Sequence, residues 1–279
     1  MLSFFQTHFN KRQIPNFLVI GAQKCGTTAL HNYLAKHPQL AAPQKEIRYF
    51  NSDIRYRLGK DFYNKFFTDV LTTSRNICFD TSPGYFTNSN SAERIYHHNK
   101  NIKMILLLRD PSERAFSAWN MYLPRFQKTE NWFKDWLADT STDRILIRRN
   151  IENFSNFSYV IEEEVDFLRR YDPEKYILEA PILSQGFYWT NLSRYYRYFS
   201  RNQILIIETK MLYNNTVAVL EKIELFLGLS AHKWNQENLS PVFEGAYGDR
   251  HISPKDRQTL DQIYFDENNL LGKNTGIWL

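Results

Sequence analysis

The chain has 279 residues, enough for one large domain or two small ones with a sizeable buried core. Hydrophobic residues make up 43% and charged residues 23%, a globular composition that excludes collagen-like and disordered proteins. The net charge of +5 favours anionic partners, but it does not choose among nucleic acid, membrane surface, nucleotide and acidic glycan. Two cysteines, Cys25 and Cys78, are too few for a disulfide scaffold or a cysteine-based zinc site.

The sequence also indicates where in the cell the protein is expected. No apolar run approaches the roughly 18 residues of a membrane span. Residues 1–16 have no long apolar core and no small-residue cleavage site, which argues against a secretory signal. We therefore expect a cytoplasmic protein with reduced cysteines and no membrane span.

The predicted elements alternate between short apolar strands and helices. Strands are expected at 16–21, 76–79, 102–108 and 203–208, and helices at 27–36, at 91–98, from 110 onward and at 217–227. This order predicts an α/β fold with a parallel sheet flanked by helices, whose strand-to-helix loops gather at one edge. The stretch from about 123 to 185 is expected to be a mostly helical excursion over that edge, so that residues 1–279 form a single domain.

A glycine-rich loop follows the first predicted strand directly. Gly21 and Gly26 have the G-x-x-x-x-G spacing of a phosphate-binding loop, and Thr27 and Thr28 open the next helix. Glycines let the backbone wrap an anion, helix-start amides point at it, and Lys24 supplies a positive charge from inside the loop. Because the lysine does not follow the second glycine, a standard ATPase or kinase is disfavoured. The alternative is a tight turn that binds nothing.

A second anion site is suggested after the most apolar strand. Arg109 stands at its carboxyl end, and Ser117 lies two helical turns later. Both could face the loop edge and hold a phosphate, since an arginine presents a planar fork of donors. The alternative is an ion pair between Arg109 and Asp110 or Glu113 at the start of the helix.

Four motifs in this order carry a resemblance to a known family: QKCGTTAL, KEIRYF, DTSPGYF and LLLRDPSERAFSAW. They resemble those of the sulfotransferases that use 3′-phosphoadenosine 5′-phosphosulfate (PAPS). The chain is most similar to the heparan-sulfate-type and related bacterial branch. The resemblance extends over nearly the whole chain, through GFYWTNLSRYYRYF, QILIIETKML, EKIELFLGL and a tail with Phe265 and Asn269. It implies the P-loop-type sulfotransferase fold.

The resemblance also implies roles for particular residues. The loop that would hold the 5′-phosphosulfate comprises Gln23, Lys24, Cys25, Gly26, Thr27 and Thr28. Lys24 would contact the bridging oxygen as the sulfuryl group leaves. Arg109 and Ser117 match the pair that binds the 3′-phosphate, and Glu46 matches the carboxylate proposed as general base. The family needs no metal.

Two departures from the family pattern concern substrate binding. Heparan-sulfate enzymes carry a lysine where this chain has Thr81, which puts specificity for an anionic glycan in doubt. The late basic loop that covers the nucleotide is weakened here at 247–251. Within this part of the chain, Arg250 is the best candidate for the 3′-phosphate and Lys255 a weaker one.

The sequence predicts transfer of a sulfuryl group from PAPS to a hydroxyl or amine of a glycan, lipid or small molecule. Its partners would then be a nucleotide donor and an unidentified acceptor, with no nucleic acid. Open alternatives are a nucleotide-binding module without transferase activity and a P-loop kinase. Glu46 could be a surface carboxylate paired with Lys45 or Arg48, and adenine could stack on Phe243 or Tyr247. Histidines weighed as alternative bases are His31, His37, His97 and His98.

Overall fold

The computed structural model describes residues 14–128, 132–134, 144–235, 239 and 250–279. The chain divides into two compact units. The first comprises 1–51, 55–108 and 193–244, and the second comprises 52–54, 109–192 and 245–279. That residues 1–279 act as a single domain stays a prediction.

The first unit is built on a five-stranded sheet with the order β2-β3-β1-β4-β7. Its strands are β1 (Phe17–Gly21), β2 (Leu40–Ala41), β3 (Ile77–Thr81), β4 (Lys103–Leu108) and β7 (Ile204–Glu208). All neighbouring strands in this sheet are parallel, which confirms the predicted α/β fold. Because β1 lies in the middle of the sheet and is buried along its whole length, the loop that follows it starts from a rigid base.

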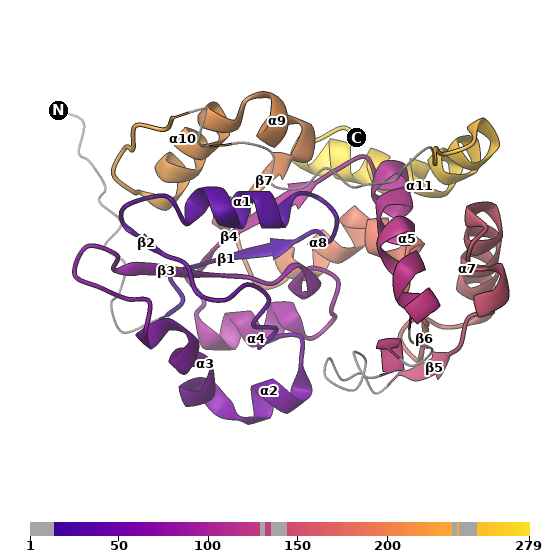
Figure 1. Cartoon of the computed structure of the whole chain (residues 1–279), viewed down its shortest axis with the longest axis horizontal. Coiled ribbons are helices and arrows are strands. Elements are labelled where there is room, and N and C mark those ends of the chain that lie inside the picture. Colours follow the sequence, from indigo (N-terminus) through magenta and orange to yellow (C-terminus); the bar gives the residue numbers. More distant parts are fainter. Residues whose placement is uncertain (1–13, 129–131, 135–143, 236–238, 240–249) are drawn as a thin grey trace. The chain divides into compact units, whose positions relative to one another are not determined.

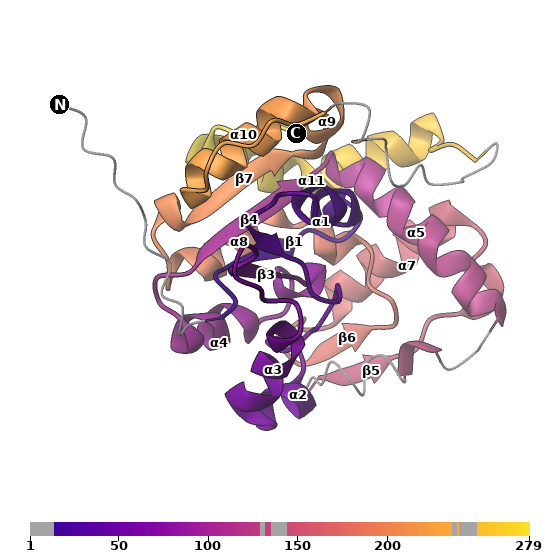
Figure 2. The same ribbon diagram turned by 60° about the vertical axis from the view of Figure 1, so that its left-hand side comes forward.

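Helices cover both faces of this sheet (Figures 1 and 2). On one face lie α1 (Thr27–Leu34), α9 (Thr209–Asn214) and α10 (Thr216–Leu227), and on the other lies α4 (Ser91–His98). The segment between β2 and β3 forms α2 (Asp53–Arg57) and α3 (Gly59–Thr68). Single-turn 3-10 helices with described bounds are η1 (Pro83–Tyr85), η2 (Ile151–Asn153), η3 (Leu183–Gly186) and η4 (Arg201–Gln203). Apolar side chains fill the space between the layers, as in the stacked pair of Phe17 and Phe79.

The second unit is mainly helical. It contains α5 (Pro111–Lys128), α7 (Phe157–Arg170), α11 (Pro254–Thr275) and the short parallel strands β5 (Ile145–Ile147) and β6 (Tyr176–Leu178). Its core joins the helices through aromatic contacts, such as Trp119 of α5 against Phe157 of α7. Helix α8 (Tyr188–Tyr196) begins in this unit and ends in the first.

A group of buried charges lies inside the second unit. The Arg149 guanidinium contacts Glu163 at 2.7 Å and Glu164 at 2.5 Å, and its Nε donates to the backbone oxygen of Glu179 at 2.6 Å. The Glu179 carboxylate, fully buried, faces Arg148 at 3.1 Å. These contacts tie β5, α7 and the segment after β6 together.

The predicted strands and helices are all present, within a few residues of the expected bounds. The predicted helix start at Asp110 is confirmed, because its Oδ1 accepts from the amide of Glu113 at 2.9 Å. The stretch from 123 to 185 was expected to be mostly helical, but it also contains β5 and β6. Those strands have three residues each, too few for an alternating pattern to show.

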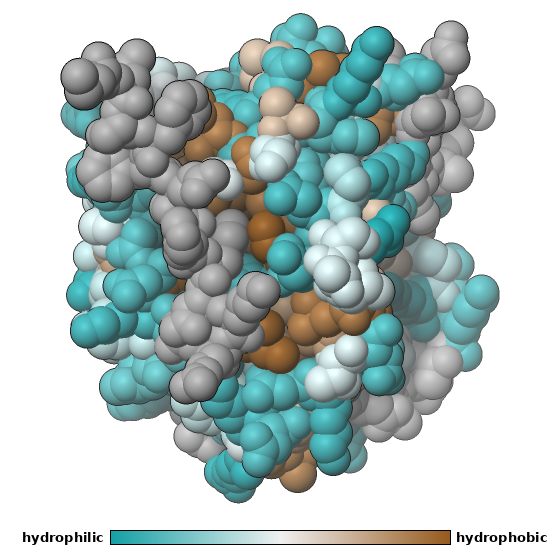
Figure 3. Space-filling model, turned by 90° about the vertical axis from the view of Figure 1, so that its left-hand side faces the viewer, coloured by the Kyte–Doolittle hydropathy of each residue, from teal (hydrophilic) through white to brown (hydrophobic). Residues whose placement is uncertain are grey.

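Among the described residues, no helix is long and apolar enough to cross a membrane. On the face of the molecule shown in Figure 3, hydrophilic residues cover most of the surface and hydrophobic ones form smaller separate patches.

Candidate functional site

The predicted phosphate loop connects β1 to α1, as the sequence indicates. Lys24 and Gly26 both have left-handed backbone angles, with φ of 67° and 87°, and together they bend the loop back before α1 begins. Position 26 favours glycine because residues with a Cβ rarely adopt its left-handed φ, and a Cβ there would also lie 3.0 Å from the Tyr213 hydroxyl oxygen. No side chain caps the start of α1. Its first amides, which have no intrahelical acceptor, are the groups that an anion would need.

Hydrogen bonds to neighbouring elements hold the loop in place. The amide of Ala22 donates to the Leu107 carbonyl of β4 at 2.8 Å, and the hydroxyl of Thr209 donates to the Cys25 carbonyl at 2.8 Å. Cys25 is fully buried, and its Sγ lies 3.7 Å from the Gln23 carbonyl. This cysteine therefore serves the shape of the loop.

Glu46 lies in the same unit, with both possible ion pairs present. Lys45 Nζ is 2.8 Å from one carboxylate oxygen, and an Arg48 nitrogen is 3.6 Å from the other. The structure therefore contains the ion pairs of Glu46 with Lys45 and Arg48 that the sequence suggests as the alternative to a catalytic role. The Glu46 side chain is nevertheless 41% exposed, so a solute can still reach it.

The backbone around Glu46 is fastened to the DTSPGYF segment. The Glu46 amide donates to the Thr81 carbonyl at 2.9 Å. Thr81 in turn has its hydroxyl 3.0 Å from Nδ1 of His31, which lies on α1 directly after the phosphate loop. The structure therefore ties the Glu46 segment to the phosphate-loop helix through Thr81.

Asp80 was not singled out by the sequence. Its side chain is fully buried and accepts hydrogen bonds from the hydroxyls of Tyr63, Ser82 and Tyr85 at 2.8, 2.8 and 2.5 Å. Burial raises the pKa of the Asp80 carboxyl, the three hydroxyl hydrogen bonds oppose that shift, and the nearby charge of Glu46 adds to it. What distinguishes this aspartate from others at strand ends is that three hydroxyls meet at its carboxyl group, two from the segment that follows it and one from Tyr63 on α3.

The histidines considered as bases have structural partners. Burial, with a smaller contribution from the charge of Lys45, lowers the pKa of His31 to about 4, so the ring is neutral near pH 7. His37 Nε2 lies 3.2 Å from the Ser230 carbonyl, and His98 Nε2 lies 3.0 Å from the Ile14 carbonyl. His97 is an exposed partner of Glu93. His31 is the only one of the four that these contacts link to the Glu46 segment.

The second predicted anion site belongs to the second unit. Arg109 pairs with Glu113 through two nitrogens, each 2.9 Å from the same oxygen, which is the helix-start ion pair given as the alternative. Ser117 is buried on α5. Arg250 extends over the ring of Trp119 on the same helix, with its guanidinium carbon 5.8 Å from the ring centre. Arg250 thus packs against α5, the helix that carries Ser117. Phe243 and Tyr247 lie outside the described residues.

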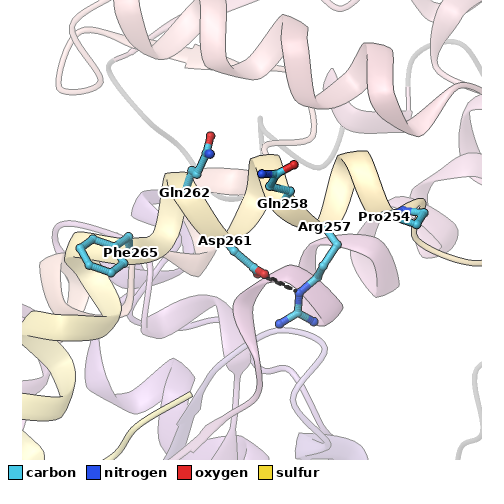
Figure 4. Close-up of a pocket in the computed structure, with 6 residues that line it drawn as sticks. All are labelled: Pro254, Arg257, Gln258, Asp261, Gln262 and Phe265. Carbon is cyan, nitrogen blue, oxygen red and sulfur yellow. Dashed lines mark hydrogen bonds and ion pairs between the residues drawn. The ribbon is translucent and has the colours of Figure 1, made fainter.

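A pocket of about 640 Å³ lies along α11 (Figure 4). Its lining residues are Pro254, Arg257, Gln258, Asp261, Gln262 and Phe265. None of them is a predicted donor-binding residue. Arg257, however, also contacts Asp110 at 2.7 Å, and Asp110 directly follows Arg109. In the part of the chain that the structure describes, no group of three or more His, Cys, Asp or Glu side chains could hold a metal ion.

A central parallel strand, a glycine loop and an uncapped helix start define the first unit as a P-loop-type fold. The family model for the sulfotransferase domain matches residues 15–247, and the chain belongs to this family. The crystal structure of a sulfotransferase from Alicyclobacillus acidocaldarius is similar over 95% of this chain and 97% of that one. Its TM-score is 0.66 and its sequence identity 24%, which supports the sulfotransferase fold.

Curated relatives agree with this assignment. The chain is 28% identical over 225 residues to the bifunctional heparan sulfate N-deacetylase/N-sulfotransferase 4 of Mus musculus, covering 78% of this chain and 23% of that protein. It is 41% identical over 120 residues to the membrane-associated sulfotransferase kil1 of Dictyostelium discoideum, covering 42% of this chain and 25% of that protein. The chain therefore spans about a quarter of the length of these relatives.

Proposed function

We propose that this protein transfers a sulfuryl group from PAPS to a hydroxyl or amine of an acceptor and releases 3′-phosphoadenosine 5′-phosphate. The observation that carries the proposal is that Lys24, inside a bent phosphate loop, and Glu46 belong to the same unit. The backbone of Glu46 is tied to that loop's helix through Thr81 and His31, and a simple nucleotide-binding loop does not require such a connection to a carboxylate-bearing segment.

The donor's phosphosulfate is held by the loop residues Gln23, Lys24, Cys25, Gly26, Thr27 and Thr28 in this proposal. Amides at the start of α1 and the two threonine hydroxyls are suitable donors to its oxygens. Arg109, Ser117 and Arg250 are assigned to the 3′-phosphate. For Arg109, binding means that the phosphate competes with Glu113 for the guanidinium donors.

The chemical step resembles phosphoryl transfer in its demands. The acceptor's oxygen or nitrogen forms a bond to sulfur while the bond from sulfur to the bridging oxygen breaks, and the acceptor's proton passes to Glu46. Lys24 stabilises the negative charge that develops on the bridging oxygen. Glu46 contributes as general base, an effect that is typically about 10²–10⁴-fold. No metal is assigned to any step.

The acceptor is proposed by class only: a glycan, a lipid or a small hydroxylated or amino compound. The relatives named for heparan sulfate favour a glycan, whereas Thr81, which replaces the family lysine, weakens the case for an anionic one. We further propose that the protein acts in the cytoplasm.

A second candidate function is a nucleotide-binding module without transferase activity. The observation that favours it is the contact of both Glu46 oxygens with cations, since a carboxylate paired in this way is a poorer base.

A screen with ³⁵S-labelled PAPS against glycans, lipids and metabolites distinguishes these candidates. Sulfuryl transfer predicts label in at least one acceptor, and loss of that label when Glu46 is replaced by Gln. Saturable nucleotide binding without label in any acceptor would support the binding module instead. Binding of ATP that requires Mg²⁺ would point to the P-loop kinase.

A further inference from the structure

The segment that carries Glu46 has an unusual backbone conformation. Glu46 and Arg48 have φ angles of 63° and 57°, in the left-handed region that residues other than glycine rarely adopt. Such residues persist only where the surrounding structure fixes them. Something must therefore hold this segment in place against its own preference.

Two hydroxyl oxygens supply part of that restraint. The amide of Arg48 donates to Ser82 Oγ at 3.1 Å, and the amide of Tyr49 donates to the Tyr85 hydroxyl at 3.0 Å. A backbone amide can only donate, so each hydroxyl must accept here and send its own hydrogen elsewhere. A hydroxyl can rotate, and these contacts last only if another acceptor fixes its direction.

Asp80 is that other acceptor for both hydroxyls. Ser82 donates to Oδ1 at 2.8 Å, and Tyr85 donates to Oδ2 at 2.5 Å. The carboxylate is completely buried, and Tyr63 adds a third hydroxyl at 2.8 Å. One carboxyl group thus sets the direction of both hydroxyls that receive the amides of Arg48 and Tyr49.

We infer that Asp80 is a positioning residue for sulfuryl transfer: it orients Ser82 and Tyr85 and thereby holds the backbone that presents Glu46. This inference rests on the proposed role of Glu46 as general base. Asp80 is enclosed by Tyr63, Ser82 and Tyr85. Its effect on catalysis is therefore indirect, through the position of the backbone that carries Glu46. The restraint is needed because the left-handed conformation at Glu46 determines where its carboxylate points.

Amide hydrogen exchange tests this restraint and needs no sulfuryl-acceptor substrate. Asp80→Asn replaces one acceptor oxygen by an NH₂ donor, so one of the two hydroxyls must turn away. We expect the amides of Arg48 and Tyr49 to exchange about tenfold faster or more, while the amides of β4 keep their protection. Ser82→Ala is the milder second variant, expected to release the Arg48 amide alone.

The matched control is Glu224→Gln. Glu224 is a buried carboxylate on α10 in the same unit, and it accepts from Trp234 Nε1 at 2.7 Å, away from the Glu46 segment. Its variant should leave the Arg48 and Tyr49 amides unchanged. Unchanged exchange at both amides in Asp80→Asn, or an equal rise over the whole unit, would overturn the inference.

A double-mutant cycle then connects the restraint to catalysis. Labelled PAPS is mixed with excess enzyme, with water as the acceptor, and release of sulfate is followed for the native protein, Asp80→Asn, Glu46→Gln and the double variant. We expect losses of about 10–100-fold for Asp80→Asn and about 10²–10⁴-fold for Glu46→Gln. The double variant should be no slower than Glu46→Gln, because no base remains to be positioned.

The two possible failures look different in this cycle. Losses that multiply in the double variant would show that Asp80 acts independently of Glu46, and the inference would fail. Full activity of Glu46→Gln would remove Glu46 as the base, and the proposed function would fail in that part even if the exchange result stands.

Discussion

In the first unit the buried carboxylate of Asp80 accepts from neutral hydroxyls alone, whereas in the second unit Glu164 and Glu179 face arginine side chains. The hydroxyls around Asp80 pass its influence on to backbone amides near Glu46. The second unit's network is centred on Arg149, whose side chain is completely buried, and it joins three segments of that unit.

Because the partners of the buried carboxylates differ, we expect the two networks to have different effects. Hydroxyls are weak partners, but each both donates and accepts, so they can transmit a direction from one group to another. Buried ion pairs are costly to break because the remaining partner is left as an uncompensated charge. We therefore expect the Asp80 network to affect catalysis most and the Arg149 network to affect folding stability most.

The largest effect on stability is expected for Arg149→Ala. Removing this side chain leaves Glu163 and Glu164 without their guanidinium partner, and we expect the free energy of unfolding to fall by about 3–5 kcal/mol. Urea denaturation measures this change. The control is Arg170→Ala, which removes an exposed pair with Asp166 and should cost about 0–1 kcal/mol. Equal, small losses in both variants would remove the contrast between the two networks.

Lys24→Ala is expected to have the next largest effect, on catalysis and not on stability. If Lys24 stabilises the bridging oxygen as proposed, loss of its charge should lower the rate of sulfate release from PAPS by about 10²–10³-fold. Its melting temperature should remain close to that of the native protein. Lys65→Ala, at an exposed position on α3, serves as the matched control. A similar rate loss in both lysine variants would contradict a local role for Lys24.

A pH-dependent effect on stability is expected from His31. The pKa of His31 is lowered from 6.5 to about 4, chiefly by burial. Below about pH 6.5 the unfolded chain takes up a proton at this residue that the folded chain takes up only near pH 4. The free energy of unfolding should therefore fall as the pH is lowered through that window.

Replacing His31 by Gln keeps a polar partner for Thr81 and should flatten this dependence, as thermal unfolding between pH 7 and pH 4 would show. His97→Gln should leave the slope unchanged, since His97 is exposed beside Glu93. An identical slope in native protein and His31→Gln would contradict the assigned shift.

The contrast also shows what sequence can predict here. The phosphate loop is a local signal, since glycines, lysine and threonines lie within eight residues of one strand end, and its structure matches the prediction. The Asp80 network joins positions from 48 to 85, and Arg149 meets partners up to 31 residues away. No periodic pattern in the sequence indicates contacts between residues so far apart, so neither network was predicted.

Arg109 shows a further limit. Its sequence context allows both a phosphate contact and an ion pair with Glu113, and the structure contains the ion pair. An arginine that binds a ligand and one that pairs with a helix-start carboxylate share the same local pattern. The choice depends on what binds, which the chain alone does not encode.

Calorimetric titration with 3′-phosphoadenosine 5′-phosphate tests the central claim, that this protein is built to bind a PAPS-type donor. The account predicts saturable binding at one site per chain. Binding should be weakened about tenfold or more by Arg109→Ala, since a hydrogen bond to a charged group contributes about 1.5–3 kcal/mol. Absence of saturable binding by the native protein, or affinity unchanged by Arg109→Ala, would contradict the account.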